Sequence, residues 1–184
     1  MVITRTKELI FGYIEDNIRR RMQNWKNKFL SSAGKEILSK SVATAMPTYT
    51  MACFKLHCKL CKEICALMAN YWRGEQDNRN KIHWVSWKKM TKDKKEGGLG
   101  FKDIQSFNKA LPAKQIWRII THPNLLANKV FKAKYFSKGN IQSCKVPNNA
   151  SWFWQCIMGV RGDISWGVWK RMGNGKNTKI WEDR

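Results

Sequence analysis

The stretch LIFGYIEDNIRRRMQNWKNKF, residues 9–29, shows the pattern on which the fold prediction rests. Its apolar residues recur every three or four positions, as they do along one face of an α-helix. This apolar face consists of Ile10, Ile14, Ile18, Met22, Trp25 and Phe29. Arginine and lysine residues, Arg19 and Lys28 among them, occupy the positions between. The stretch therefore predicts an amphipathic helix with a basic face.

Two more helices are predicted before residue 73. Ser31 or Ser32 can cap the first of them, and Pro47 ends it. Its apolar stripe consists of Ile37, Leu38, Val42 and Ala45. Residues 47–56, PTYTMACFKL, are rich in aromatic and β-prone residues and predict an extended connector. Helical spacing returns across residues 58–72 with Leu60, Ile64, Leu67, Met68 and Tyr71.

The polar stretch RGEQDNRNK, residues 73–81, has no periodicity and predicts a loop between two subdomains. Residues 82–101 then combine two tryptophans, a lysine cluster and a Gly-Gly-Leu-Gly turn, which requires positive φ angles. The cluster consists of Lys88, Lys89, Lys92, Lys94 and Lys95. Asp103 can cap the next helix, in which Pro112 predicts a bend.

The remaining sequence predicts shorter elements. Pro123 suits the first turn of a helix that continues to Tyr135, and a short aromatic helix is predicted over residues 152–158. The stretch VWKRMGNGKNTKIW, residues 168–181, predicts a β-hairpin about an Asn-Gly turn. The predicted fold class is therefore mainly α. A helical subdomain over residues 1–72 is followed by a helical connection subdomain over residues 81–184, with a small C-terminal β-hairpin.

The charge balance restricts the class of partner. Lysine and arginine number 35 against 13 aspartates and glutamates, a formal net charge of +22, which favours a polyanion. Because 43% of the residues are apolar and ten are tryptophan, the chain can bury a core and is unlike a disordered basic tail. Cations interleaved with aromatic residues favour nucleic acid, as RNA, DNA or an RNA–DNA hybrid. Helical spacing nevertheless predicts that Trp25 and Trp117 belong to the core.

No stretch resembles an export signal or approaches the length of a membrane span. We therefore expect an intracellular protein, nuclear or cytoplasmic, with no membrane partner and no small-molecule substrate. Its six cysteines are then expected to be reduced. The sequence leaves the oligomeric state open.

The residue types that carry chemistry do not form a complete site. His57, Cys58, Cys61 and Cys65 suggest half a zinc site, but on a helix these cysteines form one narrow stripe, and no second ligand pair follows. Two-metal nucleotidyl transfer requires converging carboxylates, and the sequence has no Asp-Asp pair. Neither GGLG nor GNG has the pattern of a phosphate-binding loop. We expect no catalytic residue, no metal and no cofactor; a polymerase or nuclease activity in this chain alone is the enzymatic alternative.

Residues 25–56, WKNKFLSSAGKEILSKSVATAMPTYTMACFKL, resemble the segment that follows the palm in reverse transcriptases of plant LINE-type, non-LTR retrotransposons. The resemblance continues in order through YWRG, KIHWVSW, GGLGFKDI, FNKALPAKQIWRII, KAKYF and WKRMGNGKNTKIWED, and so covers nearly the whole chain. In that family the first segment is similar to the thumb, whose helices hold the template–primer duplex. The sequence departs from the family pattern at residues 57–64 and at Pro112, which fits drift in a decaying element.

The resemblance implies a thumb followed by a connection region. The palm with its paired aspartates is then expected before Met1, and a zinc-binding module, often with an RNase H-like domain, after Arg184. Among the matched positions, it implies thumb contacts at Ser31, Gly34, Lys35 and Lys40, with Trp25 and Leu38 as packing residues.

Charge and resemblance together predict a set of residues that bind the nucleic-acid backbone without reading sequence and without catalysis. The set consists of Arg19, Lys28, Ser31, Gly34, Lys35, Lys40, Lys88, Lys89, Lys92, Lys94 and Lys95. Two other interpretations stay open, a basic module that binds an acidic protein and the non-functional product of a pseudogene.

Overall fold

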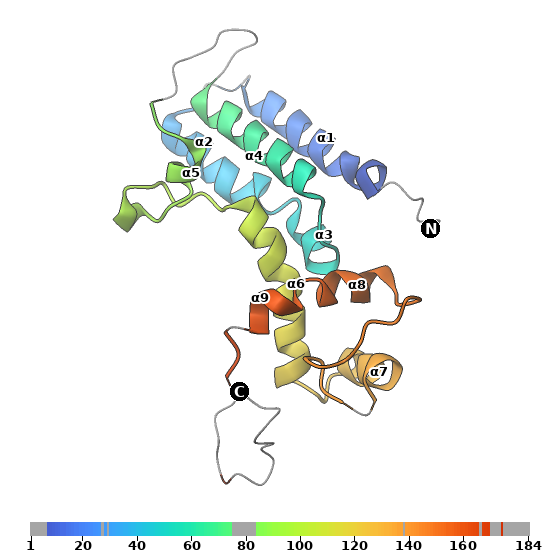
Figure 1. Ribbon diagram of the computed structural model, residues 1–184. Helices are drawn as coiled ribbons and strands as arrows, with labels where there is room; N and C mark the ends of the chain where they lie inside the picture. Colours follow the sequence, from blue (N-terminus) through green and yellow to red (C-terminus); the bar gives the residue numbers. More distant parts are fainter. Residues whose placement is uncertain are drawn as a thin grey trace. The chain divides into compact units, whose positions relative to one another are not determined.

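Figure 1 shows the computed structural model, which describes residues 7–26, 28, 30–74, 84–137, 139–165, 167–169 and 174. Every regular element within these residues is a helix, which confirms the mainly α fold class. The chain forms two compact units, one up to Pro112 and the other from Ala113, and each has buried apolar residues of its own. The subdomain boundary predicted at residues 73–81 falls largely outside the described residues and stays a prediction.

Two helices of the first unit, α1 (Lys7–Lys26) and α4 (Cys58–Arg73), lie side by side (Figure 1). Their apolar faces bury the side chains of Ile14, Ile18, Met22, Ile64, Met68 and Tyr71. Burial of each aliphatic side chain of this size stabilises the fold by about 1.5–3 kcal/mol. Both helices and their buried faces confirm the periodicity seen in the sequence.

Two helix caps predicted from the sequence are present. The Ser31 hydroxyl accepts a hydrogen bond from the backbone N–H of Gly34 at 3.3 Å and so begins α2 (Ser32–Leu38). The Asp103 carboxylate accepts from two backbone N–H groups in the first turn of α6 (Ile104–Thr121), at 3.2 and 3.3 Å. Each cap satisfies donors that have no partner inside their helix.

A π-helical turn, η1 (Ser39–Ala43), follows α2 directly. Its wider turn shows in the hydrogen bond from the Thr44 N–H to the Ser39 carbonyl, five residues back, at 3.2 Å. The additional residue in this turn rotates the helix face, so that Ser39 and Thr44 are buried. Two residues predicted in the apolar stripe, Ile37 and Ala45, are instead exposed, Ile37 to 64%. That part of the prediction was wrong because a regular helical period does not anticipate a π turn.

Residues 47–56 do not form the predicted extended connector. They contain α3 (Thr48–Cys53), after which the Phe54 N–H bonds the Thr50 carbonyl at 2.7 Å. Met51, near the centre of this helix, is completely buried. Burial in the core therefore outweighs the local preference of aromatic and β-branched residues for a strand.

The helix α6 continues through Pro112 to Thr121 without interruption. Before the proline, the side chain of Asn108 is buried and exchanges two hydrogen bonds with the backbone of Leu56. The Leu56 N–H donates to Asn108 Oδ1, and Asn108 Nδ2 donates to the Leu56 carbonyl, both at 2.9 Å. This pair holds α6 against the segment that joins α3 to α4.

The second unit contains α7 (Leu126–Tyr135), α8 (Trp152–Met158) and α9 (Arg161–Ser165). At its centre, Trp154 is fully buried and stacks on Tyr135, with 4.5 Å between ring centroids. The bounds of α8 confirm the aromatic helix predicted over residues 152–158, whereas α7 begins after Pro123 and not at it.

Two further predictions concern this unit. Trp117, predicted in the core from its spacing, is 50% exposed, so that prediction was wrong. The hairpin predicted over residues 168–181 lies almost wholly outside the described residues and stays a prediction. Within the described part of the chain, the helices are too short or too polar to cross a membrane.

Candidate nucleic-acid interface

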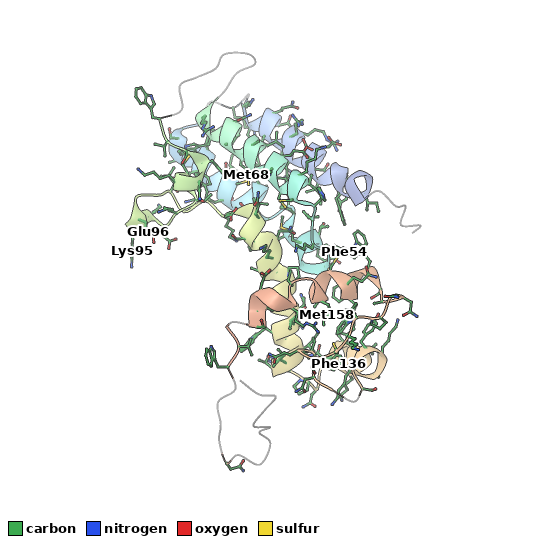
Figure 2. All side chains as sticks on the ribbon, viewed as in Figure 1. Phe54, Met68, Lys95, Glu96, Phe136 and Met158 are labelled. Carbon is green, nitrogen blue, oxygen red and sulfur yellow. The ribbon has the colours of Figure 1, made fainter. Side chains whose placement is uncertain are left out.

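The lysine cluster lies in one segment of the first unit, residues 86–101, which we call the lysine loop. It contains α5 (Trp87–Met90) and the 3-10 turn η2 (Lys94–Glu96). The side chains of Lys88, Lys89, Lys92, Lys94 and Lys95 are all exposed. Figure 2 shows Lys95 and Glu96 at the outer tip of this loop. The loop thus presents several cations to solvent on a short stretch of backbone.

Backbone hydrogen bonds fold the lysine loop back on itself. The N–H groups of Leu99 and Phe101 both bond the Met90 carbonyl, at 3.1 and 3.3 Å. The Gly100 N–H bonds the Lys92 carbonyl at 2.8 Å. These bonds close the loop around η2 and fix the backbone that carries the lysines.

Three glycines make this closure sterically possible. Gly97 and Gly100 have φ angles of 77° and 71°, which confirms the positive φ predicted for the turn. Gly98 is limited by space, because a Cβ atom there would lie 2.1 Å from the Lys92 carbonyl oxygen. A larger residue at position 98 would push the two sides of the loop apart.

Aromatic packing attaches the lysine loop to α4. Phe101, 2% exposed, lies between two tryptophans, with ring centroids 4.9 Å from Trp87 and 5.5 Å from Trp72. Trp72 belongs to the last turn of α4, and Trp87 begins α5. The loop is therefore held at its base by a small aromatic cluster while its lysines project outward.

Lys40 makes a second attachment. Its ammonium lies 2.5 Å from Glu36 Oε1, donates a hydrogen bond to the Leu99 carbonyl, and is 5.2 Å from the centre of the Phe101 ring. Its side chain is largely covered. The charge of Lys40 is thus used within the protein, to join η1 to the lysine loop.

Glu36 connects the same two segments from the acidic side. The hydrogen bond from Lys40 lowers the pKa of the Glu36 carboxyl below its ordinary value; desolvation opposes this, and the positive charges of Lys40 and Lys94 add to it. Lys94 Nζ lies 3.7 Å from Glu36 Oε1. The Glu36 carboxylate therefore partly neutralises the positive charges of Lys40 and Lys94, two of the residues predicted to bind phosphate.

The structure gives three other predicted contacts local roles. Ser31 and Gly34 form the cap of α2. The Lys35 ammonium reaches the carboxyl end of α4, where it would lie 3.4 Å from a Cβ atom on Gly74. A cation is favourable there because the last carbonyl groups of a helix carry partial negative charge.

Arg19 and Lys28 are not joined to this group. Arg19 lies on α1 and forms an ion pair of 2.5 Å with Glu15, one helical turn earlier. Lys28 is exposed after the end of α1. Within the described residues, neither side chain has a hydrogen bond or ion pair to the lysine loop.

The lysines of the loop differ in whether an acidic side chain lies near them. Lys92 lies 3.9 Å from Glu96, and Lys94 is near Glu36. Lys88, Lys89 and Lys95 have no ion pair within the described part of the chain and are exposed. We call these three the free lysines. They are the cations most available to an external phosphate.

Sequence reasoning did not find the residues that hold the lysine loop in place. The contacts of Trp72, Trp87 and Phe101 join parts of the chain that are distant in sequence. The interleaving of tryptophan with lysine in residues 84–89 was the one available signal. It did not distinguish Trp87, which packs, from Trp84, which is 90% exposed.

Two cysteines of the stripe on α4, Cys61 and Cys65, are held in the protonated thiol form. Burial, reinforced by the neighbouring Cys65 and Cys58 thiols and by Asp103, raises the pKa of Cys61 to about 12. Burial also raises the pKa of Cys65. Among the described residues, no group of three or more His, Cys, Asp or Glu side chains is placed to hold a metal ion.

Comparisons with known proteins identify two plant relatives. The chain is 40% identical over 141 residues to the "Uncharacterized mitochondrial protein" of Arabidopsis thaliana, an alignment that covers 76% of the chain and 92% of that protein. It is 34% identical over 179 residues to a "Putative ribonuclease H protein" of the same plant and spans 28% of that protein's length. No family model and no solved structure matches the chain.

Proposed function

The chain belongs to the same plant protein family as the "Uncharacterized mitochondrial protein" of Arabidopsis thaliana, and we propose that it binds the phosphate backbone of a nucleic-acid duplex. The observation that carries this proposal is the lysine loop, which presents the free lysines on a backbone closed by hydrogen bonds. A net charge of +22 favours a polyanion of any shape, whereas a fixed group of cations favours a regular row of phosphates.

The proposed origin of the chain is the thumb and connection region of a reverse transcriptase from a plant non-LTR retroelement. The collinear motifs of residues 25–56 and beyond support it. In the family that they resemble, an RNase H-like domain often follows the connection region. That order agrees with the similarity to a much longer plant protein whose name refers to ribonuclease H. The proposed ligand is accordingly a template–primer duplex, and the polymerase palm would belong to a separate part of the parent protein.

The proposed mechanism is electrostatic. Each lysine that neutralises a phosphate releases condensed counterions, so the affinity falls as salt is added. The free lysines contribute directly to this counterion release. Lys92 and Lys94 contribute less, because Glu96 and Glu36 lie near them.

Lys40 has a different part in the proposal. Because its ammonium is engaged with Glu36 and Leu99, it acts as a positioning residue that keeps the lysine loop against η1. Lysine is a flexible point charge without a planar array of donors, so this surface holds backbone and does not read bases.

The chain is proposed to have no catalytic activity of its own. Nucleotidyl transfer needs carboxylates that converge on two metal ions, and the sequence contains no Asp-Asp pair. Primer extension on an RNA template, with Mg²⁺ and all four deoxynucleotides, is the direct test. Incorporation by the purified chain that is absent from a mock preparation would contradict this part of the proposal.

The binding proposal is tested by fluorescence anisotropy with an RNA–DNA hybrid of about 16 base pairs, titrated at several salt concentrations. A triple variant changes the free lysines, Lys88, Lys89 and Lys95, to alanine. A matched control changes Lys55, Lys59 and Lys62, which are exposed on another part of the first unit, to alanine. Both variants lose the same charge.

We expect the wild-type affinity to fall steeply with salt. In the free-lysine variant, the slope of log K against log salt should be less steep by about 2.7, or 0.9 for each phosphate that is no longer neutralised. In the control the slope should change far less. A dissociation constant that does not depend on salt would contradict the proposal. An equal loss of slope in both variants would instead show non-specific attraction to net charge.

A further inference from the structure

The second unit contains a cavity of about 420 Å³ between the end of α6, one side of α7 and residues 139–142. Its lining includes Trp117 from α6, Lys132 from α7 and Trp169. Binding sites for small molecules commonly have volumes of roughly 300–1,000 Å³ and combine apolar walls with a few polar groups. Binding of a nucleic-acid backbone by the lysine loop does not involve this cavity.

Both tryptophans at the cavity are largely uncovered. Trp117 is 50% exposed and Trp169 is 78% exposed, although the same unit buries Trp154 completely. Leaving an indole in water forgoes the stabilisation that its burial would supply. Two such rings at one cavity are therefore more consistent with a surface for a flat partner than with incomplete packing.

The unit that contains the cavity is strongly basic. Residues 113–169 contain eight lysines and arginines and a single acidic residue, Asp163. On α7 alone, Lys129, Lys132 and Lys134 follow one another without an acidic residue. Lys132 lines the cavity itself. The ligand is accordingly expected to combine an apolar, planar part with negative charge.

Hydrogen bonds hold two sides of the cavity in place. Asn128 is buried, and its Nδ2 donates to the carbonyls of Arg118 and His122 at 3.0 and 2.5 Å, which fixes the turn between α6 and α7. On the other side, an Arg161 guanidinium nitrogen donates to the Cys144 carbonyl at 2.6 Å, next to the cavity-lining residue Ile141. The walls are thus formed before any ligand arrives, which lowers the entropic cost of binding.

We propose that this cavity accepts an unpaired base of single-stranded nucleic acid, which stacks on Trp117 or Trp169 while Lys132 binds an adjoining phosphate. The inference rests on the proposed function, because it takes nucleic acid as the partner, and extends it from duplex backbone to unpaired bases. Every base has a face that can stack, so the site is tolerant of sequence.

The test compares two labelled probes by fluorescence anisotropy. One is an oligothymidylate of about 12 nucleotides, and the other is an abasic oligomer with the same number of phosphates. Electrostatic attraction is equal for the two, so any difference reports the bases. We expect the full chain to bind the oligothymidylate about tenfold or more tightly than the abasic oligomer, in the range that stacking on aromatic residues supplies.

Two variants assign this preference to the cavity. At least one of Trp117→Ala and Trp169→Ala should reduce the preference for the base-bearing probe, with the affinity for the abasic oligomer unchanged. The matched control is Trp84→Ala, since Trp84 is a tryptophan of the first unit that is 90% exposed. It should keep the full preference. Because Trp169 is mostly exposed, its replacement is not expected to unfold the unit.

The outcomes separate this inference from the proposed function. Equal affinity for the two probes, or a preference that survives in both variants, overturns the base site even if the duplex still binds through the free lysines. If the chain prefers the oligothymidylate but does not bind the duplex in a salt-dependent way, only the proposed duplex binding by the free lysines is overturned. Competition by polyglutamate as effective as that by oligothymidylate would overturn the base site in favour of an acidic protein partner.

Discussion

Lys40 donates a hydrogen bond to the backbone carbonyl of Leu99, a residue 59 positions further along the chain. The same ammonium is paired with Glu36 and lies over the Phe101 ring. A lysine that the resemblance implies as a duplex contact is therefore a structural link between η1 and the lysine loop. The effect of each lysine on binding should depend on whether it is such a link or one of the free lysines.

Replacing Lys40 with methionine tests the link. Lys40→Met keeps most of the apolar stem but leaves Glu36 and the Leu99 carbonyl without this donor. The free energy of unfolding should fall by about 1–3 kcal/mol, and the affinity for the hybrid duplex should fall because the loop is less well placed. The slope of log K against log salt should change by clearly less than about 0.9, the value for one phosphate that is no longer neutralised.

Lys95→Met is the matched variant for this comparison. Lys95 is exposed at the tip of the loop. Its replacement should change the free energy of unfolding by less than about 0.5 kcal/mol and should make the slope of log K against log salt less steep by about 0.9. Urea unfolding and anisotropy titrations measure the two quantities. If Lys40→Met lowers the slope as much as Lys95→Met does, Lys40 binds phosphate directly and the positioning role is incorrect.

Gly98→Ala should open the lysine loop. Its Cβ would meet the Lys92 carbonyl oxygen at 2.1 Å, and that oxygen belongs to backbone that cannot rotate away. We expect a loss of about 1–3 kcal/mol in unfolding free energy, faster amide exchange at Gly100 and weaker duplex binding. Gly139→Ala is the control, since no atom lies within 4 Å of a Cβ at that position. A loop that exchanges no faster in Gly98→Ala than in the control would contradict this account.

Asn108→Ala should destabilise the first unit. It leaves the buried N–H and carbonyl of Leu56 without their partner at 2.9 Å. Each unsatisfied group costs about 1–3 kcal/mol, so a total loss of about 2–6 kcal/mol is expected from urea unfolding. Asn148→Ala, on an exposed loop, should change stability by less than about 0.5 kcal/mol. Similar midpoints for the two variants would argue against the pair.

Alkaline pH should destabilise the fold through Cys61. Its pKa is raised to about 12 in the folded chain, against an ordinary value of 9.0. Between these values the unfolded thiol releases a proton that the folded thiol keeps, so increasing pH favours unfolding. The contribution of Cys61 is fully present below pH 9.0 and is lost as pH rises towards 12, by at most about 1.4 kcal/mol per pH unit.

Urea unfolding at about pH 8 and about pH 10.5 measures this dependence. Tyr71, whose pKa burial also raises, contributes with the same sign. The double variant Cys61→Ala with Tyr71→Phe should therefore have a flatter pH profile, even though its stability at pH 8 is lower. Cys156→Ala, in α8 of the second unit, is the control and should keep the shape of the wild-type profile. An unchanged profile in the double variant would refute the assignment.

The long helices were predictable from the sequence because their cause is local. The spacing of Ile14, Ile18 and Met22 places them on one face of α1 whatever else the chain does. The caps at Ser31 and Asp103 are equally local, since each side chain bonds a backbone group two or three residues away. Where a longer-range contact competed, as at α3 and at the π turn of η1, local preference gave the wrong result.

The different roles of the individual lysines and tryptophans were beyond sequence reasoning. Lys40 and Lys95 are alike in type, yet the first is paired with Glu36 and Leu99 and the second is exposed. Trp154 is buried and Trp169 is exposed in the same unit. No periodicity separates them, because each outcome depends on a neighbour contributed by another part of the chain.

By itself, the sequence determined a helical, strongly basic chain whose turn at residues 97–100 needs glycine, since periodicity, net charge and backbone sterics are properties of short stretches. Only the tertiary structure decided which lysines remain free, because Lys40 meets Leu99, 59 positions further along, only after the chain between them has folded. It also decided that Trp117 and Trp169 line one cavity. Contacts of this kind arise from packing between elements, and packing is a property of the folded chain alone.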